Sequence, residues 1–265
     1  MNLSKVKAGM QTLTMGQTIH FFRELTSTND MAKELALIEA EEGTVIVAET
    51  QTQGRGRLGR KWVSPKGGLW FSIILRPRIS VENARKLTLV MSVAVAKTLS
   101  KVFNLGAEIK WPNDVLIRGK KVCGILTEAN TIEKRLNFIV VGLGINANFN
   151  LQDLPVNIRD SSTTLKEELN SEIDCQAFLR GLLEETERYY KAFTEGKFKA
   201  VLAEWRHFAK FLGSQIKVTS LDETIEGWAT DIDDNGALII KLTDQTIRKV
   251  FSGDVTICKV KRELS

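Results

Sequence analysis

The sequence has few of the residues that build metal centres or disulfide frameworks. It contains two histidines, His20 and His207, and three widely separated cysteines, Cys123, Cys175 and Cys258. An odd number of scattered cysteines favours reduced thiols and a cytoplasmic setting, and the shortage of histidine argues against a His/Cys metal cage. The N-terminus lacks a signal-peptide core, and no apolar run approaches the length of a membrane span.

The overall composition is that of an ordinary soluble globular protein, with 43% hydrophobic and 26% charged residues. A chain of 265 residues accommodates one large domain and one small one. The net charge of +5 permits binding to a polyanion without requiring it. Composition alone therefore leaves the function open.

Acidic residues are absent from positions 50 to 81, where seven cations occur. Most of these cations lie in a glycine-rich loop, residues 54–62, between two apolar runs at 44–48 and 69–75 that predict buried strands. A loop with this charge repels itself unless an anion binds, and its glycines let backbone N–H groups approach that anion. The sequence therefore predicts an anion-binding loop that lacks counter-charge and is mobile without its ligand.

The glycine spacing of the loop does not identify the anion by itself. Gly54, Gly56 and Gly59 fit the dinucleotide-binding pattern, but Pro65 and the glycines at 67–68 exclude the helix that this pattern needs. No Walker phosphate loop occurs in the chain. Alternating arginine and glycine also fits an RNA-binding surface, and a solvated charged hairpin would explain the same residues. The neighbouring motifs have to decide between these interpretations.

The pattern along the chain predicts a mixed domain of strands and helices followed by a small all-β domain. We expect residues 1–17 to be a tail or a leading strand, residues 18–212 to form the first domain and residues 213–265 the second. The expected helices follow Ser27 as far as Gly43, follow Ser80 to about 103, and cover about 174–195 and a shorter stretch through 205. Five short strands at 216–219, 225–230, 237–241, 246–251 and 255–259 predict a small β-barrel.

Ser27 and Asp30 have the spacing of a capping box at the start of the first of these helices. Thr28 and Asn29 would then lie in the first turn of the helix, where free N–H groups attract polar ligand atoms. Helix capping alone would also account for these residues.

A second polar motif lies at residues 110–114, between two predicted strands. Lys110 precedes a Pro-Asn kink, and the amide of Asn113 and the carboxylate of Asp114 suit a magnesium ion or its waters. Lys121 lies across the following hairpin, where an ammonium group can meet a carboxylate or a phosphate. A twisted hairpin with surface charges would give the same pattern.

Together these stretches resemble the biotin–protein ligases, in order and in spacing, over about residues 18–259. The matching pieces are Ser27-Thr28-Asn29, Glu49-Thr50-Gln51 leading into residues 54–62, Lys110 to Asp114, Lys121 with Gly124-Ile125-Leu126, and Gly142-x-Gly144-x-Asn146. The resemblance implies an α+β fold: a mixed β-sheet catalytic domain of the class II aminoacyl-tRNA synthetase and biotin synthetase type, with a small C-terminal SH3-like β-barrel.

The resemblance also implies a two-step reaction with biotin, ATP and magnesium. Biotin and Mg·ATP would form biotinyl-5′-AMP and pyrophosphate, and a lysine of a biotin carboxyl carrier protein would then take the biotin. Members that act as repressors carry an N-terminal DNA-binding domain, and at most seventeen residues precede the matching region here. We therefore expect a ligase without specific DNA binding or membrane association. The identity of the carrier and the choice between monomer and homodimer stay open.

The roles of individual residues are likewise implied by the resemblance. Biotin binding would fall to Ser27, Thr28, Asn29, Gln51, Gly54, Arg55, Gly56, Arg57, Lys121 and Gly124. ATP binding would fall to Arg55, Arg57, Arg60, Trp62 stacked on adenine, Lys110, Asn113, Lys121 and Asn146, with Ser162 and Thr163 near the nucleotide. Catalysis would rest on the cations Arg57, Lys110 and Lys121, because a carboxylate must attack a negatively charged phosphate. Asp114 would bind magnesium.

Two alternatives remain beside this interpretation. Lipoate–protein ligases resemble these enzymes in fold and reaction, although residues 54–62 and 110–114 favour biotin. An RNA-binding protein belongs to a different class and would use the basic loop together with the C-terminal strands. It would need aromatic residues interleaved with cations on those strands, which offer Trp228 and Phe251 beside acidic residues.

Overall fold

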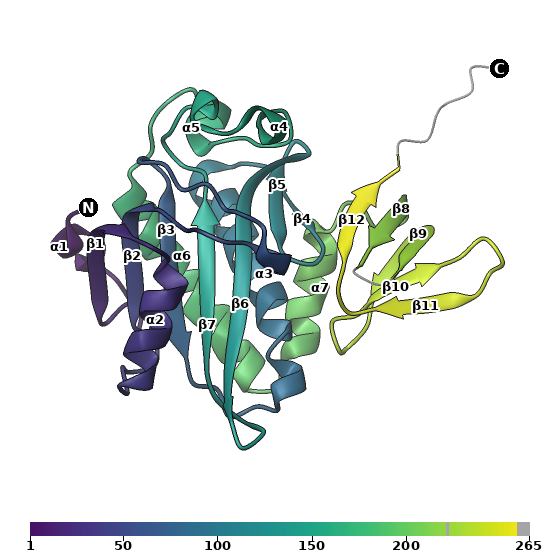
Figure 1. The fold of residues 1–265 in the computed structure, drawn as a ribbon, viewed down its shortest axis with the longest axis horizontal. Helices are drawn as coiled ribbons and strands as arrows, with labels where there is room; N and C mark the ends of the chain where they lie inside the picture. The colour runs from purple at the N-terminus through teal and green to yellow at the C-terminus, as the bar shows by residue number, and fades with distance from the viewer. Residues whose placement is uncertain (221–222, 259–265) are drawn as a thin grey trace.

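The computed structural model describes residues 1–220 and 223–258, which form two β-sheets with helices packed around the first (Figure 1). The elements that surround the first sheet are α1 (Leu3–Lys7), β1 (Ile19–Leu25), α2 (Thr28–Leu37), β2 (Val45–Gln51), η1 (Arg57–Gly59), β3 (Leu69–Leu75), η2 (Val81–Asn83), α3 (Lys86–Phe103), β4 (Ala107–Lys110), β5 (Asp114–Ile117), β6 (Lys120–Ile132), β7 (Arg135–Ile145), η3 (Leu151–Asp153), α4 (Val156–Arg159), α5 (Leu165–Leu169), α6 (Cys175–Thr194) and α7 (Phe198–Phe208). The second sheet contains β8 (Gln215–Thr219), β9 (Thr224–Ile232), β10 (Leu238–Lys241), β11 (Ile247–Val250) and β12 (Asp254–Ile257).

The first sheet has the strand order β1-β2-β3-β7-β6-β5-β4. The pair β1–β2 is parallel and the remaining pairs are antiparallel, so the sheet is mixed. Helix α2 covers one face, while α3, α6 and α7 cover the other (Figure 1). This arrangement confirms the expected α+β architecture.

The central strand β3 explains why the two faces of this sheet differ. All seven of its residues are buried, as expected for a strand that is covered on both sides. Ile73 and Leu75 point into the core beneath α3 and α6, and Ile74 packs beneath α2. Ser72 lies two residues before Ile74 and therefore on the same face of the strand, toward α2. Because it is a buried serine, the contacts on this face are polar at Ser72 and apolar at Ile74. Polar side chains of α2 and β2 gather next to Ser72.

The second sheet is antiparallel, with the order β11-β10-β9-β8-β12. The five predicted strands are present, but within the described residues the sheet does not close, because β11 and β12 do not pair. The predicted end of the last strand, Lys259, lies outside the described residues. The boundary near Leu212 stays a prediction, since one apolar core runs from α7 into β8 and β9.

The N-terminal segment differs from the tail or leading strand that we expected. It begins with the short helix α1, and both Val6 and Met15 are fully buried in the main core. The carboxylate of Glu187 accepts hydrogen bonds from the backbone N–H groups of Leu13, Thr14 and Met15. Tertiary contacts with α6, which local sequence does not reveal, therefore determine its structure.

Some of the predicted helix ends were wrong, although the end near 103 and the helix at about 174–195 agree with α3 and α6 to within one residue. Ser27 stands at the N-cap of α2 but makes no side-chain capping bond, and the helix ends at Leu37, well before Gly43. Ser80 begins the short turn η2, and α3 starts only at Lys86. The polar stretch after Asn146 was not predicted to contain helices, yet it folds as η3, α4 and α5.

Within residues 1–220 and 223–258, none of the helices combines the length and the apolar character needed to cross a bilayer. All three cysteines are free thiols. Burial raises the pKa of the Cys123 thiol far above its ordinary value, so it is not a nucleophile at neutral pH.

Candidate functional site

The floor of the candidate site is a patch of glycines on β6 and β7. Gly124 of β6 pairs with Gly144 of β7, and Gly142 pairs with Ser72 of β3. A Cβ atom on Gly142 would lie 2.2 Å from the side-chain oxygen of Asn29, and one on Gly144 would lie 2.5 Å from the indole nitrogen of Trp62. The missing side chains therefore let α2 and the basic loop approach the sheet closely.

Polar groups from three elements meet at the N-terminus of α2. The side-chain oxygen of Gln51 accepts hydrogen bonds from the backbone N–H of Thr28, at 2.8 Å, and from its hydroxyl, at 3.1 Å. The Gln51 amide donates to Ser64 at 2.8 Å, and the buried Ser72 hydroxyl lies within 2.7 Å of both Thr28 and Asn29. The expected capping box is replaced by this network, in which Gln51 satisfies the first N–H of the helix.

The first arginine of the basic loop has local counter-ions. Arg55 forms a bidentate pair with Asp30 of α2, at 2.5 and 2.6 Å, and also contacts Glu128 of β6. The hydrogen bond from Arg55 holds the pKa of Asp30 below its ordinary value, and the same bond raises the pKa of Arg55. Asp30 therefore acts as an ion-pair partner rather than as part of a helix cap.

The loop itself is a small hairpin that extends from β2 and β3. Gln51 pairs with Ser64 and Arg55 pairs with Lys61, while η1 forms the tip. Leu58 at the tip has a φ of +55°, in the left-handed region that non-glycine residues seldom adopt. In Figure 1 the loop crosses the α2 face of the sheet toward the second domain.

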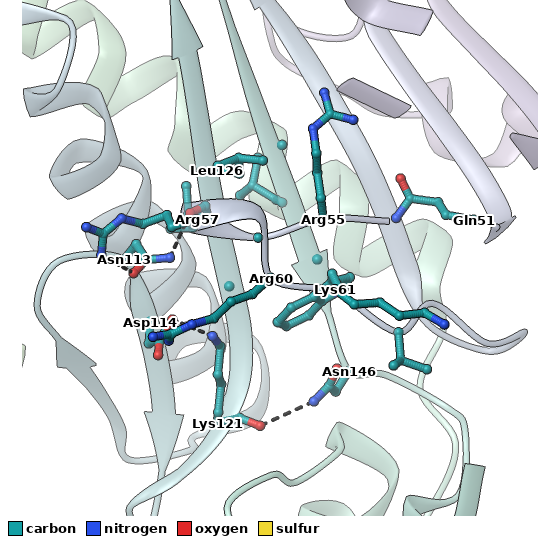
Figure 2. A pocket seen from close by; sticks show the side chains of 18 of the residues that line it. Gln51, Arg55, Arg57, Arg60, Lys61, Asn113, Asp114, Lys121, Leu126 and Asn146 are labelled. Carbon is teal, nitrogen blue, oxygen red and sulfur yellow. Dashed lines mark hydrogen bonds and ion pairs between the residues drawn. The ribbon is translucent and has the colours of Figure 1, made fainter. Parts of the chain in front are cut away.

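The tip of the loop contacts the second domain. Arg57 donates to the carbonyl of Gly253 at 3.2 Å and lies 3.9 Å from the carboxylate of Asp254, which also pairs with Arg60. Burial lowers the pKa of Arg57, and the carboxylates of Asp254 and Asp114 oppose that effect. Figure 2 shows Arg57 and Arg60 extending to one side of the cavity and Arg55 extending in another direction.

These contacts correct the expectation of a loop without counter-charge. Arg55, Arg57, Arg60 and Lys66 each pair with an acid from outside the acid-free stretch. Electrostatic repulsion within the stretch is therefore relieved by tertiary contacts. The prediction that the loop is mobile without ligand loses its original argument.

Trp62 lies over the glycine floor beside Lys121. The Lys121 ammonium is 5.1 Å from the centre of the indole ring, and Trp62 also makes an edge contact with Trp70. The buried indole N–H of Trp62 has no hydrogen-bond partner among the described residues. Gly124 was expected to bind biotin, but the space next to its Cα is occupied by Trp62 in this structure.

The kink at 111–113 brings a second pair of charges to the cavity. The Lys121 ammonium lies 2.6 Å from the carboxylate of Asp114. Asn113 accepts a hydrogen bond from the backbone N–H of Ile125 with its own backbone carbonyl, and its side-chain amide donates to the Ile125 carbonyl. The Asn113 oxygen also accepts a long hydrogen bond, 3.4 Å, from Arg57. Lys121, Asp114 and Arg57 thus form one side of the site.

The segment after β7 closes the site from the direction of α4 and α5. The side-chain amide of Asn146 donates hydrogen bonds to the carbonyls of Lys121 and Thr163, and Figure 2 shows the bond from Asn146 to Lys121. Ser162 forms an isolated β-bridge with Lys121. Ser161 and Ser162 line the cavity, whereas the Thr163 hydroxyl turns away to Glu168.

These groups surround one cavity of about 250 Å³. Its lining includes most of the residues that the sequence predicted, namely Ser27, Thr28, Asn29, Gln51, Arg55, Gly56, Arg57, Arg60, Trp62, Asn113, Asp114, Lys121, Gly124, Asn146 and Ser162. Gly54 and Lys110 are not in the lining. A Cβ atom on Gly54 would lie 2.5 Å from the carbonyl of Trp62, so Gly54 serves the close crossing of the hairpin strands.

Sequence reasoning missed several residues of the site. Lys61, Leu126, Leu143, Leu154, Ile158 and Asp254 line the cavity, and Glu128 holds two of its lining residues. A cationic loop with no nearby acid does indicate that acids must come from elsewhere. Nothing in the sequence, however, identifies Asp254, which comes from the far end of the chain.

Over the part of the chain that the structure describes, no group of three or more His, Cys, Asp or Glu side chains could hold a metal ion. Two carboxylates line the cavity, Asp114 and Asp254, and each is paired with a cation. One carboxylate with substrate phosphates is nevertheless a common way for proteins to hold magnesium.

Comparison with known proteins gives consistent matches over both domains. Residues 21–146 match the biotin/lipoate A/B protein ligase family, and residues 211–257 match the biotin protein ligase C-terminal domain. The bifunctional ligase/repressor BirA of Bacillus subtilis is 37% identical over 255 residues, covering 96% of this chain and 78% of that protein. The biotin–[acetyl-CoA-carboxylase] ligase of Paracoccus denitrificans is 31% identical, covering 81% of this chain and 90% of that protein.

A solved structure agrees with these sequence matches. The biotin protein ligase from Aquifex aeolicus in complex with biotin and ATP is 32% identical to this chain and superimposes with a TM-score of 0.80. The similarity covers 92% of this chain and 99% of that one, so it includes both sheets.

Proposed function

The chain belongs to the biotin–protein ligase family, and we propose from its geometry how it binds biotin and ATP in the one cavity described above. As a member of this family it is an ATP-dependent ligase that activates biotin and transfers it to acetyl-CoA carboxylase. The assignment of individual residues to the two substrates is our proposal.

The observation that carries the proposal is the division of the cavity into a neutral end and a cationic end. Hydroxyl and amide groups of Thr28, Asn29 and Gln51 gather at the neutral end, where the charge of the neighbouring Arg55 is balanced by acids. Lys121 and Arg57 lie at the cationic end. Biotin has the matching polarity, because its ureido ring is a neutral hydrogen-bonding group and its chain ends in a carboxylate. Its ureido ring would therefore face α2 and its carboxylate would face Lys121.

This polarity also favours biotin over lipoate. A lipoyl group ends in a dithiolane ring that cannot use hydroxyl and amide partners, so a polar inner end would bind it less well. The RNA-binding alternative gains little support from the second sheet. The ring of Phe251, one of its two candidate aromatics, is covered by the guanidinium of Arg85 at 4.2 Å.

In the first step, the biotin carboxylate attacks the α-phosphorus of ATP and pyrophosphate leaves. Both reactants are anions, so the main requirement is positive charge placed before the reaction begins. Lys121 would shift its ammonium from Asp114 to the carboxylate and the α-phosphate. Arg57 and Arg60 would exchange Asp254 for phosphate oxygens. No nucleophilic side chain is needed, and positioning supplies most of the rate enhancement.

ATP would bind beside biotin, on the side of the cavity formed by Trp62, Leu154 and Ile158. Adenine would stack on the indole face of Trp62 that is turned away from the glycine floor. Asn146 and Ser162 would contact the nucleotide from the segment after β7. Lys110 does not line the cavity, so we assign it no direct contact with the adenosine and place it near the departing pyrophosphate.

Magnesium would accompany ATP, with Asp114 as its protein ligand. The residues fit this role, because a single carboxylate together with phosphates suffices, but Asp114 must first release Lys121. When bound, the ion would neutralise charge on the phosphates.

In the second step, an acceptor lysine attacks the acyl group of biotinyl-5′-AMP and AMP leaves. We propose that this lysine belongs to a biotin carboxyl carrier protein, in keeping with the relatives named as biotin–[acetyl-CoA-carboxylase] ligases. We also propose that the sheet β8–β12 corresponds to the small SH3-like barrel of the family and the first domain to its class II synthetase-like fold.

The test is ATP-dependent transfer of labelled biotin to a purified carrier domain in the presence of magnesium. We expect labelling of the carrier that requires ATP, and none when the acceptor lysine of the carrier is replaced by arginine. Labelled lipoic acid offered in the same assay distinguishes the two ligase reactions. Transfer of lipoic acid but not biotin would reject the proposal.

A further inference from the structure

Glu128 connects two walls of the cavity without lining it. It lies on β6, and its carboxylate accepts a hydrogen bond of 2.6 Å from the side-chain amide of Asn29. The ammonium of Lys33 lies 2.5 Å from the same carboxylate, and Arg55 contacts it at 3.3 Å. One acid therefore binds the first two turns of α2 and the base of the basic loop.

The contact with Glu128 fixes the orientation of the Asn29 amide. A carboxylate accepts hydrogen bonds and cannot donate them, so the NH₂ group of Asn29 must face Glu128. The oxygen of Asn29 then faces Ser72, whose hydroxyl lies 2.6 Å away. Gly142 leaves the space in which this oxygen lies. The opposite orientation would place the amide oxygen against a negative charge.

The contact with Arg55 has a different consequence. Asp30 and Glu128 together hold the guanidinium against α2. In Figure 2 the Arg55 side chain extends away from Lys121 and Asp114. The base of the loop is therefore attached to the first domain, whereas its tip is attached to the second through Asp254. Arg55 is held by two acids of the first domain, with short contacts of 2.5 and 2.6 Å to Asp30, whereas Arg57 meets the second domain at longer distances, 3.9 Å from Asp254 and 3.2 Å from the Gly253 carbonyl.

The charges at Glu128 are balanced within the cluster. Burial acts to raise the pKa of Glu128, but the hydrogen bonds from Lys33 and Asn29 and the nearby cations outweigh it, so the pKa lies below its ordinary value. Asp30 and Glu128 carry two negative charges, and Lys33 and Arg55 carry two positive ones. The cluster therefore has no charge left for a ligand and acts as a support.

We propose that Glu128 is a positioning residue for biotin binding, which orients the amide of Asn29 and, with Asp30, holds Arg55 at the base of the loop before biotin enters. This inference rests on the proposed function, in which Asn29 contacts biotin. Glu128 touches neither substrate. Its effect on biotin binding passes through Asn29, because the two short hydrogen bonds from Arg55 to Asp30 keep Arg55 in place without Glu128.

The test compares kcat and the KM values for biotin and ATP in the wild type and in Glu128→Gln. Glutamine can present its own NH₂ group to Asn29, so the amide loses its fixed orientation while the size of the side chain is kept. We expect the KM for biotin to rise about tenfold, as for the loss of one charge-assisted hydrogen bond, with kcat and the KM for ATP changed by less than about twofold.

Glu185→Gln is the matched control. Glu185 is a buried carboxylate with two cationic partners, Lys101 and Arg188, in the helix layer on the other face of the sheet. Glu185→Gln should lower the unfolding temperature about as much as Glu128→Gln does and should leave the KM for biotin unchanged. All constants are measured below the unfolding midpoint of the least stable variant, so that loss of the fold does not enter.

A second comparison tests the path through Asn29. If Glu128 acts through Asn29, adding Glu128→Gln to Asn29→Ala should change the KM for biotin by less than about twofold. Full additivity of the two changes, or an unchanged KM in Glu128→Gln, would overturn the inference. An inactive wild type would instead reject the proposed function, so the two failures are distinguishable.

Discussion

The guanidinium of Arg57 lies 3.9 Å from the carboxylate of Asp254, although Arg57 belongs to the loop over the first sheet and Asp254 to β12 of the second domain. Arg60 pairs with the same carboxylate. The second domain therefore supplies the counter-charge that the first domain lacks at the tip of the loop. A phosphate that enters the cavity would compete with Asp254 for both arginines.

Asp254→Asn should loosen the tip of the loop. Loss of a partly exposed ion pair is worth at most about 1 kcal/mol, so trypsin should cleave after Arg57, Arg60 or Lys61 about twofold to fivefold faster. Biotin with ATP should restore protection, because phosphates replace the carboxylate. Asp244→Asn, which removes an exposed acid from the same domain, is the control. Equal cleavage rates for Asp254→Asn and the wild type would contradict this role of Asp254.

Lys121→Ala should slow the activation of biotin much more than it destabilises the fold. In the proposed function the Lys121 ammonium stabilises the negative charge of the biotin carboxylate and the α-phosphate. Such contacts contribute on the order of 3 kcal/mol, about a hundredfold in rate. Pyrophosphate release measures this step. The neighbouring Lys120 is exposed, so Lys120→Ala should keep the wild-type rate. Rapid pyrophosphate release from Lys121→Ala would show that another cation performs this task.

The sequence was informative wherever local pattern decides the structure. The continuous apolar run at 69–75 predicted β3, and the Pro-Asn kink between two strands is observed between β4 and β5. Most of the predicted site residues line one cavity, because the loop, α2 and β6 each present them from the α2 face of the sheet. Their roles toward biotin and ATP remain predictions.

The sequence was least informative where distant residues interact. Asp254 and Glu128 neutralise the loop across large separations in the chain, so the absence of nearby acids gave a false picture of its charge. Tertiary contacts likewise turned the expected N-terminal tail or strand into α1 with a buried Val6. The Ser27 side chain does not cap α2, and the Gln51 side-chain oxygen accepts the hydrogen bond from the first backbone N–H of the helix, that of Thr28. Closure of the second sheet depends on the pairing of β11 and β12, which strand pattern does not determine.

Gly142→Ala should impair biotin binding by displacing Asn29. A methyl group at this position would lie 2.2 Å from the Asn29 oxygen, and the buried surroundings cannot give way cheaply. We expect a weakening of biotin binding of at least about tenfold by calorimetry and destabilisation of about 1–3 kcal/mol. Gly106→Ala meets no atom within 4 Å and should change neither quantity. Unchanged biotin affinity in Gly142→Ala would mean that Asn29 does not contact biotin.

Arg57→Gly should still make biotinyl-5′-AMP but release it early. Arg57 ties the tip of the loop to Asn113 and to the carbonyl of Gly253, and it is the more buried of the two arginines that face Asp254. Glycine would remove these contacts and add backbone freedom, so the loop would close less often over the acyl phosphate. The adenylate would then escape and acylate lysines of other proteins.

The measurement for Arg57→Gly is biotin transfer to a bystander such as serum albumin in the presence of biotin and ATP. We expect labelling of albumin to exceed that by the wild type by about tenfold or more, because retention of the intermediate depends on a closed loop. Arg78→Gly, a change at an exposed arginine just beyond β3, should leave albumin unlabelled. Adding free lysine at high concentration should suppress the labelling, since escaped adenylate reacts in solution. If Arg57→Gly releases pyrophosphate while albumin stays unlabelled, Arg57 does not retain the intermediate, and the loop must be held by Arg60 or by the ligand itself.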